Sequence, residues 1–247
     1  IQWQWKEDVF PECDQFNGIH EGLVQSWKDI FPKKGEIYFA GALENNEDTG
    51  TLQYLASTAM EAGFSTRVLD MQALDLQNGR FFDPAGELVN RCFKLYPWEW
   101  MVDESPDGCL AEMEWLEPIW KLVMSNKAIL ATLYELFPDS PYVLPCYLSR
   151  PRSGLFCKKP VFSREGHNVS VVDIRNWEEH VRIAETEGDY NTGAYVYQEY
   201  VEPTVYSGRY PVIGSWIIGG EAAGIGIREN RMEVTDNLSE FVPHIIG

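Results

Sequence analysis

The stretch CKKPVFSREGHNVSVVD, residues 157–173, holds residue types suited to binding an anion. Lys159 stands on a β-prone run, Arg164 lies in the polar turn, and Gly166 closes that turn. Backbone N–H groups in such a turn can point at phosphate oxygens, and glycine permits a close approach. The stretch predicts a hairpin that covers phosphates. The alternative is an edge strand that lysines and a proline protect from further pairing.

Two further stretches could complete a nucleotide site. YVYQEYV places Gln198 and Glu199 among aromatic and β-branched residues, where strand backbone could bind an adenine edge; a plain core strand is the alternative. GIGIREN places Arg228 in a small, apolar strand, so the guanidinium must find an anion or lie at an edge. Neither the P-loop pattern nor a G-x-G-x-x-G after a strand occurs, so the common nucleotide folds are not supported.

An acidic turn, ENNEDTG, offers a different chemistry. Glu44, Glu47 and Asp48 could recognise an ammonium group or a metal ion, and a solvated loop is the alternative. The four histidines are too scattered to form a metal site or a Cys-His pair.

The acidic turn lies inside a predicted βαβ unit. Residues 37–42 form an apolar run, residues 51–62 carry apolar positions at helical spacing, and residues 66–69 resume β character. The two strands should be parallel with a right-handed crossover. The turn would then follow the carboxyl end of the first strand, where open α/β sheets bind ligands.

The rest of the chain predicts one long helix and then mostly antiparallel strands. The helix is expected over 116–137, and residues 155–162 and 169–173 should form the two strands of the hairpin. Further strands are expected at 194–201, 210–220 and 221–230, and one helix at 176–187. The predicted fold class is α+β.

Composition limits the possible functions. The 247 residues are 45% apolar and carry a net charge of −18, which repels phosphate backbones and argues against nucleic-acid binding. Residues 1–120 hold 8 basic and 22 acidic residues (8 − 22 = −14), and residues 121–247 hold 12 and 16 (12 − 16 = −4). The basic residues are therefore concentrated in the second part.

The five cysteines contain no CxxC pair, so neither a disulfide framework nor a zinc site is favoured. No apolar run is long enough to span a membrane, and residues 1–10 lack the features of a signal peptide. We expect a cytoplasmic protein without nucleic-acid or membrane partners.

Nine stretches, read together and in order, resemble the glutathionylspermidine synthetase family in its stand-alone acid–amine ligase branch. They are DQFNGIHEGL, EDTGTLQYL, FKLYPWEWM, WLEPIWKLVMSNKAIL, KKPVFSREGHNVSV, YVYQEYV, IGSW, AGIGIRE and FVPHI. The resemblance implies an ATP-grasp architecture. Residues 1–120 would form a substrate-side region with the βαβ unit, and residues 121–247 the nucleotide-binding region.

The resemblance also implies an activity. Members of the family activate a carboxylate with ATP as an acyl phosphate, which an amine attacks, and Mg²⁺ spans the phosphates. The expected cofactors are ATP and Mg²⁺. The expected partners are a small-molecule acid such as a glutathione-like peptide and a polyamine-like amine.

Matching residue by residue, the resemblance assigns roles to positions in this chain. Lys127 and Lys159 correspond to the lysines that contact the ATP phosphates, and Arg228 to the catalytic arginine near the γ-phosphate. The phosphate-covering loop is matched by Ser163, Arg164, Glu165 and Gly166, the adenine-side strand by Gln198, Glu199, Tyr200 and Val201, and the acidic pair that contacts the substrates by Glu47 and Asp48.

One part of the family pattern is not present. The R-x-D and E-x-N-A-D-T-P-T segments, which supply the magnesium ligands, would lie upstream of Ile1. The resemblance therefore implies the C-terminal two-thirds of the enzyme, inactive by itself. The alternative function is a nucleotide-binding or peptide/amine-binding module without ligase turnover.

Overall fold

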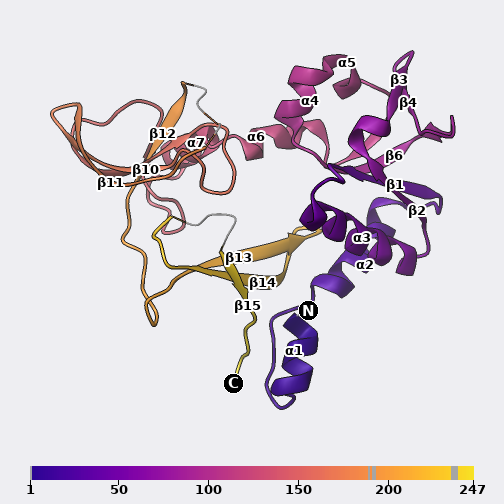
Figure 1. The fold of residues 1–247 in the computed structure, drawn as a ribbon, viewed down its shortest axis with the longest axis horizontal. Coiled ribbons are helices and arrows are strands. Elements are labelled where there is room, and N and C mark those ends of the chain that lie inside the picture. The colour runs from indigo at the N-terminus through magenta and orange to yellow at the C-terminus, as the bar shows by residue number, and fades with distance from the viewer. Residues whose placement is uncertain (1, 189, 191–192, 235–238) are drawn as a thin grey trace. The chain divides into compact units, whose positions relative to one another are not determined.

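The computed structural model describes residues 2–188, 190, 193–234 and 239–247 (Figure 1). The chain divides into two compact units. The parallel-sheet unit comprises residues 16–122 and 216–224, and the antiparallel-sheet unit comprises residues 1–15, 123–215 and 225–247. Each unit therefore draws on separate stretches of sequence. The expected division of function between 1–120 and 121–247 stays a prediction.

The parallel-sheet unit is built on a four-stranded parallel sheet of order β2-β1-β6-β7. Its strands are β1 Glu36–Gly41, β2 Ser65–Asp70, β6 Arg91–Leu95 and β7 Glu114–Leu116. Its helices are α2 Ile19–Ile30, α3 Asn46–Glu61, α4 Trp98–Glu104 and α5 Pro106–Cys109, with 3₁₀ turns η1 Met71–Ala73 and η2 Ile119–Lys121. A small sheet adds β3 Asp75–Gln77, β4 Arg80–Phe82 and β5 Leu88–Val89.

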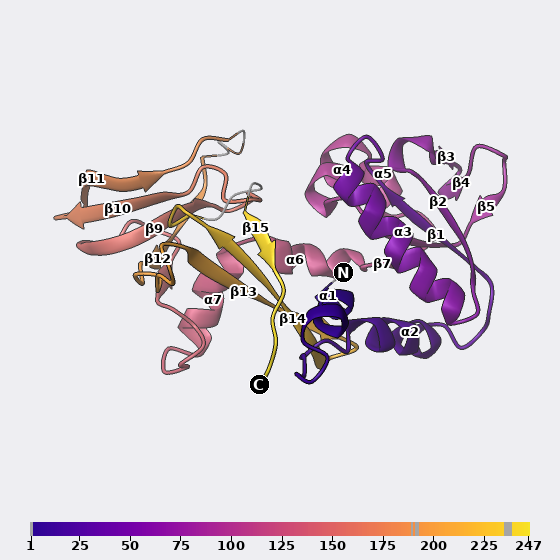
Figure 2. The same cartoon turned by 60° about the horizontal axis from the view of Figure 1, so that its bottom comes forward.

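Side-chain alternation along β1 divides the core of this unit into two layers. Ile37 and Phe39 pack with α2 and α3, which run beside the sheet in Figure 2. Tyr38 and Ala40 face the other layer, where α4 and the small sheet pack against β7. The predicted βαβ unit is confirmed, because β1 and β2 pair in parallel on either side of α3 in sequence.

The antiparallel-sheet unit contains a five-stranded sheet of order β11-β10-β9-β12-β8. Its strands are β8 Cys146–Tyr147, β9 Gly154–Pro160, β10 Ser170–Arg175, β11 Glu178–Glu185 and β12 Tyr195–Glu199. Helix α1 Gln2–Val9 opens the unit, and α7 Ala128–Leu136 packs on the sheet through Ala131, which lies against Cys146 and Val196. The predicted hairpin is confirmed, since β9 and β10 pair in antiparallel fashion.

Three more strands form a separate sheet of order β13-β14-β15. They are β13 Tyr210–Ile218, β14 Glu221–Asn230 and β15 Glu240–Val242. Strands β13 and β14 contribute residues to both units. Together the elements make a mixed α and β chain with several sheets, visible in Figures 1 and 2.

Two predicted helices are wrong. Residues 176–187 do not form a helix, because Glu178–Glu185 is strand β11, paired with β10. Asn176 and Trp177 both have positive φ, 51° and 73°. Two such residues in succession make the turn that joins antiparallel strands tightly. The acidic, helix-like composition of this stretch was overridden by pairing with its neighbour.

The long helix predicted over 116–137 is replaced by shorter elements. Leu116 ends β7, and η2, α6 Leu122–Ser125 and α7 follow in turn. The interruption lies at Lys127, whose backbone N–H donates to the carbonyl of Val161 at 2.9 Å instead of continuing a helix. This contact ties the start of α7 to the end of β9.

Candidate functional site

The adjacent lysines of β9 point to opposite faces of the five-stranded sheet. Lys158 pairs in register with Tyr197 and Lys159 with Val196, so the two side chains alternate. The Lys158 ammonium forms an ion pair with the Glu179 carboxylate at 2.9 Å. The Lys159 ammonium donates to the Gln198 amide oxygen at 2.7 Å. Lys158 is thus neutralised by a carboxylate, whereas the acceptor of Lys159 carries no charge.

Lys127 also lies close to the predicted phosphate loop. Its ammonium donates to the carbonyl oxygen of Ser163 at 2.5 Å, across 36 residues of sequence. The backbone contact with Val161 holds the same lysine at the amino end of α7. The structure therefore brings Lys127 to the first residue of the turn 163–166.

The turn itself has the backbone conformation that favours glycine. Glu165 and Gly166 both have positive φ, 53° and 73°. Beyond it, the Thr186 hydroxyl donates to the Gly166 carbonyl, and the Asn168 side chain accepts from the N–H of Tyr190 at 2.8 Å. The turn is held at both ends, by Lys127 and by this second group of contacts.

The predicted adenine-side strand is anchored on both sides. The N–H of Glu199 donates to the carbonyl of Pro145 at 2.8 Å, and the N–H of Tyr200 donates to that of Leu155 at 3.0 Å. Val201 follows with its side chain 58% exposed. Gln198 lies on the face that carries Lys159, so the structure joins the predicted phosphate lysine directly to the predicted adenine strand.

Arg228 lies on another sheet of the same unit. It is exposed on β14 and pairs in register with Phe241 of β15. The convergence of Arg228, Lys127 and Lys159 on one nucleotide stays a prediction.

In the parallel-sheet unit, strand order identifies a second candidate site. All four strands are parallel, but β2 is placed on one side of β1, whereas β6 and β7 follow on the other side. The strand order therefore reverses between β1 and β6. Ligands of open α/β sheets bind at such a reversal, outside the carboxyl ends of the strands. Gly41 ends β1 there, and a Cβ at this position would lie 3.1 Å from the carbonyl oxygen of Leu95. Glycine allows the two strand ends to approach.

The predicted acidic turn follows β1 at this edge, but it is not a loop. Helix α3 begins at Asn46, so Glu47 and Asp48 lie in its first turn. The side chain of Asn45 caps the helix by accepting the N–H of Glu47 at 2.9 Å. Acidic side chains stabilise a helix start because of the helix dipole. Helix stability alone therefore accounts for two acids here, and their contact with substrates stays a prediction.

Three residues at the same edge were missed by the sequence analysis. The Asp70 carboxylate accepts the N–H of Leu43 at 3.1 Å and so fixes the loop after β1. The Tyr96 hydroxyl donates to the Glu104 carboxylate at 2.5 Å. Burial raises the pKa of Tyr96 to about 12, and the negative charges of Glu104 and Asp70 act in the same direction. Asp70 ends β2, and Tyr96 directly follows β6. A search of the sequence for polar residues at the carboxyl ends of predicted strands could therefore have identified both.

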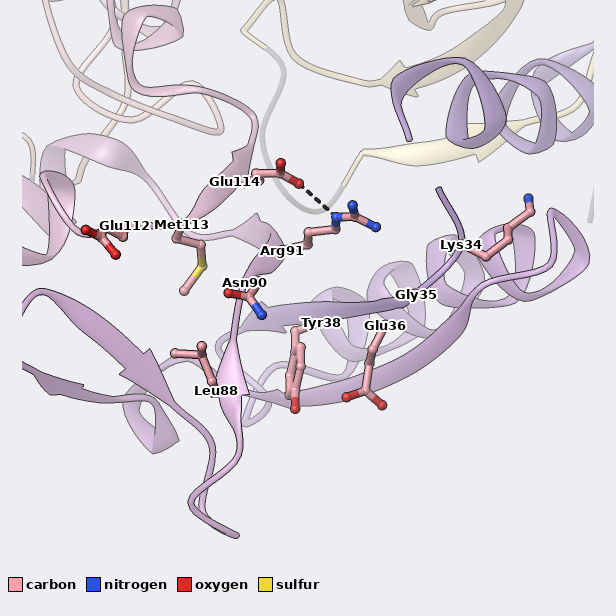
Figure 3. Close-up of a pocket in the computed structure, with 10 residues that line it drawn as sticks. All are labelled: Lys34, Gly35, Glu36, Tyr38, Leu88, Asn90, Arg91, Glu112, Met113 and Glu114. Carbon is pink, nitrogen blue, oxygen red and sulfur yellow. Dashed lines mark hydrogen bonds and ion pairs between the residues drawn. The ribbon is translucent and has the colours of Figure 1, made fainter. Parts of the chain in front are cut away.

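A cavity of about 670 Å³ opens at the other edge of this sheet (Figure 3). It is lined by Lys34, Gly35, Glu36, Tyr38, Leu88, Asn90, Arg91, Glu112, Met113 and Glu114, at the amino ends of β1, β6 and β7. Its carboxylates form ion pairs, Glu36 with Arg67, Glu112 with Arg80 and Glu114 with Arg91. The carboxylates of this cavity are already paired with arginines, so we assign it no role in catalysis.

The described residues contain no group of three His, Cys, Asp or Glu side chains arranged to hold a metal ion. The Mg²⁺ expected from the resemblance stays a prediction. Within the same part of the chain, no helix is long and apolar enough to cross a membrane.

Comparison with known proteins places the chain in a family. The family model for the glutathionylspermidine synthase preATP-grasp matches residues 1–247. A Haemophilus influenzae protein named as an acid–amine ligase is 35% identical over 99% of this chain and 66% of its own length. The trypanothione synthetase of Crithidia fasciculata is 27% identical over 98% of this chain and 41% of its own length. This chain thus spans about two-thirds of the first relative and less than half of the second.

A solved structure shares the fold. A crystal structure from Methylobacillus flagellatus, named as a gamma-glutamylcysteine synthetase, aligns with a TM-score of 0.56 over 99% of this chain and 83% of its own. At 8% sequence identity this likeness concerns the fold alone. The family match over all 247 residues is the stronger finding, and by it the chain belongs to the glutathionylspermidine synthase preATP-grasp family.

Proposed function

We propose that this chain supplies the nucleotide-binding and amine-binding parts of an ATP-dependent carboxylate–amine ligase with ATP-grasp architecture. The observation that carries the proposal is the contrast between Lys158 and Lys159. The first forms an ion pair with the Glu179 carboxylate, whereas the second donates to the neutral amide of Gln198. A partly buried ammonium that donates to a neutral amide can attract an anion, because the amide is readily exchanged for a phosphate oxygen.

In this reaction a carboxylate oxygen of the acid attacks the γ-phosphorus of ATP, and the bond to the leaving ADP breaks. The amine nitrogen then attacks the acyl carbon, phosphate leaves, and the amine loses a proton. The protein positions the reactants and neutralises charge on the transferred phosphoryl group. We assign that neutralisation to Lys127, Lys159 and Arg228, with the turn 163–166 covering the phosphates. No step is assigned to magnesium.

The second substrate would bind in the parallel-sheet unit. Glu47 and Asp48 lie in the helix turn after β1, at the edge where the strand order reverses. Two neighbouring carboxylates repel each other until a cation arrives, so a polyamine-like amine is the fitting ligand. The acid would be a glutathione-like peptide. Residues 1–120 are then the substrate side and residues 121–247 the nucleotide side.

A screen of ADP release from the full-length protein tests the reaction. Acids and amines are offered singly and in pairs, and release should require one of each. Glu47→Gln with Asp48→Asn should raise the KM for the amine and leave that for ATP nearly unchanged. Glu61→Gln, an exposed acid at the other end of α3, is the matched control. An amine KM that does not change in the double variant would remove the acidic pair from the site.

A nucleotide-binding module without turnover is the second candidate. It is favoured by the position of Glu47 and Asp48, which helix stability already explains. ATP binding without ADP release, for every pair of acid and amine offered, would support this candidate.

A further inference from the structure

The segment that follows β14 reaches the face of the five-stranded sheet that carries Lys159. The Tyr200 hydroxyl donates to the Glu233 carboxylate at 3.2 Å, across 33 residues of sequence. The N–H of Tyr200 continues the pairing with β9 through Leu155. Tyr200 is two residues beyond Gln198, so by strand alternation its side chain lies on the face that carries Gln198 and Lys159.

The charge of Glu233 affects the pKa of two groups on the same face, Cys157 and Tyr200. Burial raises the pKa of the Cys157 thiol, the Lys159 ammonium opposes this, and the Glu233 carboxylate adds to it. Cys157 pairs in register with Gln198. Burial also raises the pKa of Tyr200 to about 12, and Glu233 acts in the same direction. Glu233 therefore lies within electrostatic reach of both the adenine-side strand and the strand of Lys159.

Arg228 stands five residues before Glu233 on the same segment. Its backbone is held by pairing with β15, and beyond β14 the chain is tied to β12 by the hydrogen bond of Glu233. Tyr200 and Glu233 thus connect the sheet that carries Arg228 to the sheet that carries Lys159.

We propose that Tyr200 and Glu233 are a positioning pair for nucleotide binding. Their hydrogen bond fixes the segment after Arg228 to the adenine-side strand, so that Arg228 and Lys159 are presented to one nucleotide. This role rests on the proposed function, because it requires a nucleotide on that face. Neither residue needs to touch the nucleotide itself.

The test measures ATP affinity and steady-state kinetics in the full-length protein with Tyr200→Phe, Glu233→Ala and Glu233→Gln. Tyr200→Phe and Glu233→Ala should each weaken ATP binding about three- to tenfold, the effect of losing a hydrogen bond of ordinary net strength, because both side chains are partly exposed. Glu233→Gln keeps an oxygen acceptor and should recover most of the affinity. The double variant Tyr200→Phe with Glu233→Ala should be no worse than either single one.

A purely structural role predicts a different pattern. The positioning role requires the KM for ATP to rise while the KM for the amine and the melting temperature stay near the wild-type values. Glu229→Gln, next to Arg228 on β14, is the matched control and should change neither KM. Glu233→Gln should also speed alkylation of Cys157 at fixed pH, because it removes the negative charge that raises the thiol pKa.

The outcomes separate the two proposals. A wild-type chain that does not bind ATP overturns the proposed function and the positioning role together. A wild type that binds ATP, with Tyr200→Phe and Glu233→Ala binding equally well, overturns the positioning role alone. A parallel loss of ATP binding, amine binding and melting temperature also overturns it, in favour of a general structural contact.

Discussion

Replacing Lys159 with methionine is the most direct test of the proposed nucleotide-binding face, the side of the five-stranded sheet that carries Lys159 and Gln198. The change removes the ammonium and keeps an unbranched side chain of similar length. In the ligand-free chain it breaks the 2.7 Å hydrogen bond to Gln198. In the nucleotide complex it removes a charge-assisted bond to a phosphate oxygen.

The expected effect is the difference between these two losses. A charge-assisted bond to phosphate contributes about 1.5–3 kcal/mol, and the partly exposed bond to Gln198 about 0.5–1 kcal/mol in the free state. The net loss of binding free energy is then about 0.5–2.5 kcal/mol, or roughly two- to sixtyfold in affinity.

Titration calorimetry with ATP measures the change, and Lys158→Met is the matched control. Lys158 is the next residue on the same strand, but it faces Glu179 on the opposite side of the sheet. Its loss should leave ATP affinity unchanged and lower the stability of the fold. A second measurement needs no nucleotide. Lys159 lowers the pKa of the Cys157 thiol, so Lys159→Met should slow alkylation of Cys157, and Lys158→Met should not.

Equal ATP affinity in the wild type and Lys159→Met would refute the assignment of this face. So would a loss of affinity of the same size in Lys158→Met, since it would mean that any change in β9 disturbs binding. Unchanged alkylation of Cys157 in Lys159→Met would contradict the placement of the ammonium beside that thiol.

Three further predictions concern the fold. Thr58→Val should lower the free energy of unfolding by about 1–3 kcal/mol in denaturant titrations. The change removes the Thr58 hydroxyl, which accepts the buried indole N–H of Trp27 at 2.8 Å. Glu179→Ala should cost about 1–2 kcal/mol in the same assay, because Lys158 loses its carboxylate. Asp83→Asn should weaken the acid dependence of unfolding. The N–H of Glu87, with other donors, lowers the pKa of the Asp83 carboxyl, so its contribution is present above about pH 4 and is lost as pH falls through the lowered pKa.

Matched controls exist for the first two changes. The Ser57 hydroxyl, like that of Thr58, donates to a backbone carbonyl three residues earlier in α3, but it lies on the exposed side of the helix. Ser57→Ala should therefore cost little stability. Glu178→Ala removes the exposed neighbour of Glu179 and should also be nearly neutral. Control losses as large as those of Thr58→Val and Glu179→Ala would contradict the reasoning. For Asp83, a constant difference from wild type down to pH 2 would contradict the lowered pKa.

Local patterns were enough to predict several elements. The apolar run 37–42, the helical spacing of 51–62 and the β character of 66–69 correspond to β1, α3 and β2. The hairpin of β9 and β10 was predicted from β-prone runs on either side of a glycine-containing turn. These predictions succeeded because periodicity and turn residues act over only a few neighbours.

Local patterns failed where hydrogen bonds to another element decided the conformation. Residues 178–185 have a helix-like composition, yet β10 supplies a pairing partner and the left-handed pair 176–177 turns the chain into it. The helix expected over 116–137 is interrupted at Lys127, where the backbone bonds to Val161. In both places hydrogen bonds to another element, a neighbouring hairpin strand in the first and Val161 in the second, outweighed a weak intrinsic preference.

By itself, the sequence determined the family and the residue types available for the proposed site: two lysines, a glycine turn and an acidic pair. Only the tertiary structure decided which partners two residues adjacent in sequence would have. Lys158 and Lys159 are adjacent in sequence, but strand alternation and pairing give one a carboxylate and the other a neutral amide. The contact between Tyr200 and Glu233 spans 33 residues. No local pattern encodes such a contact, because it depends on which strands the folded chain places together.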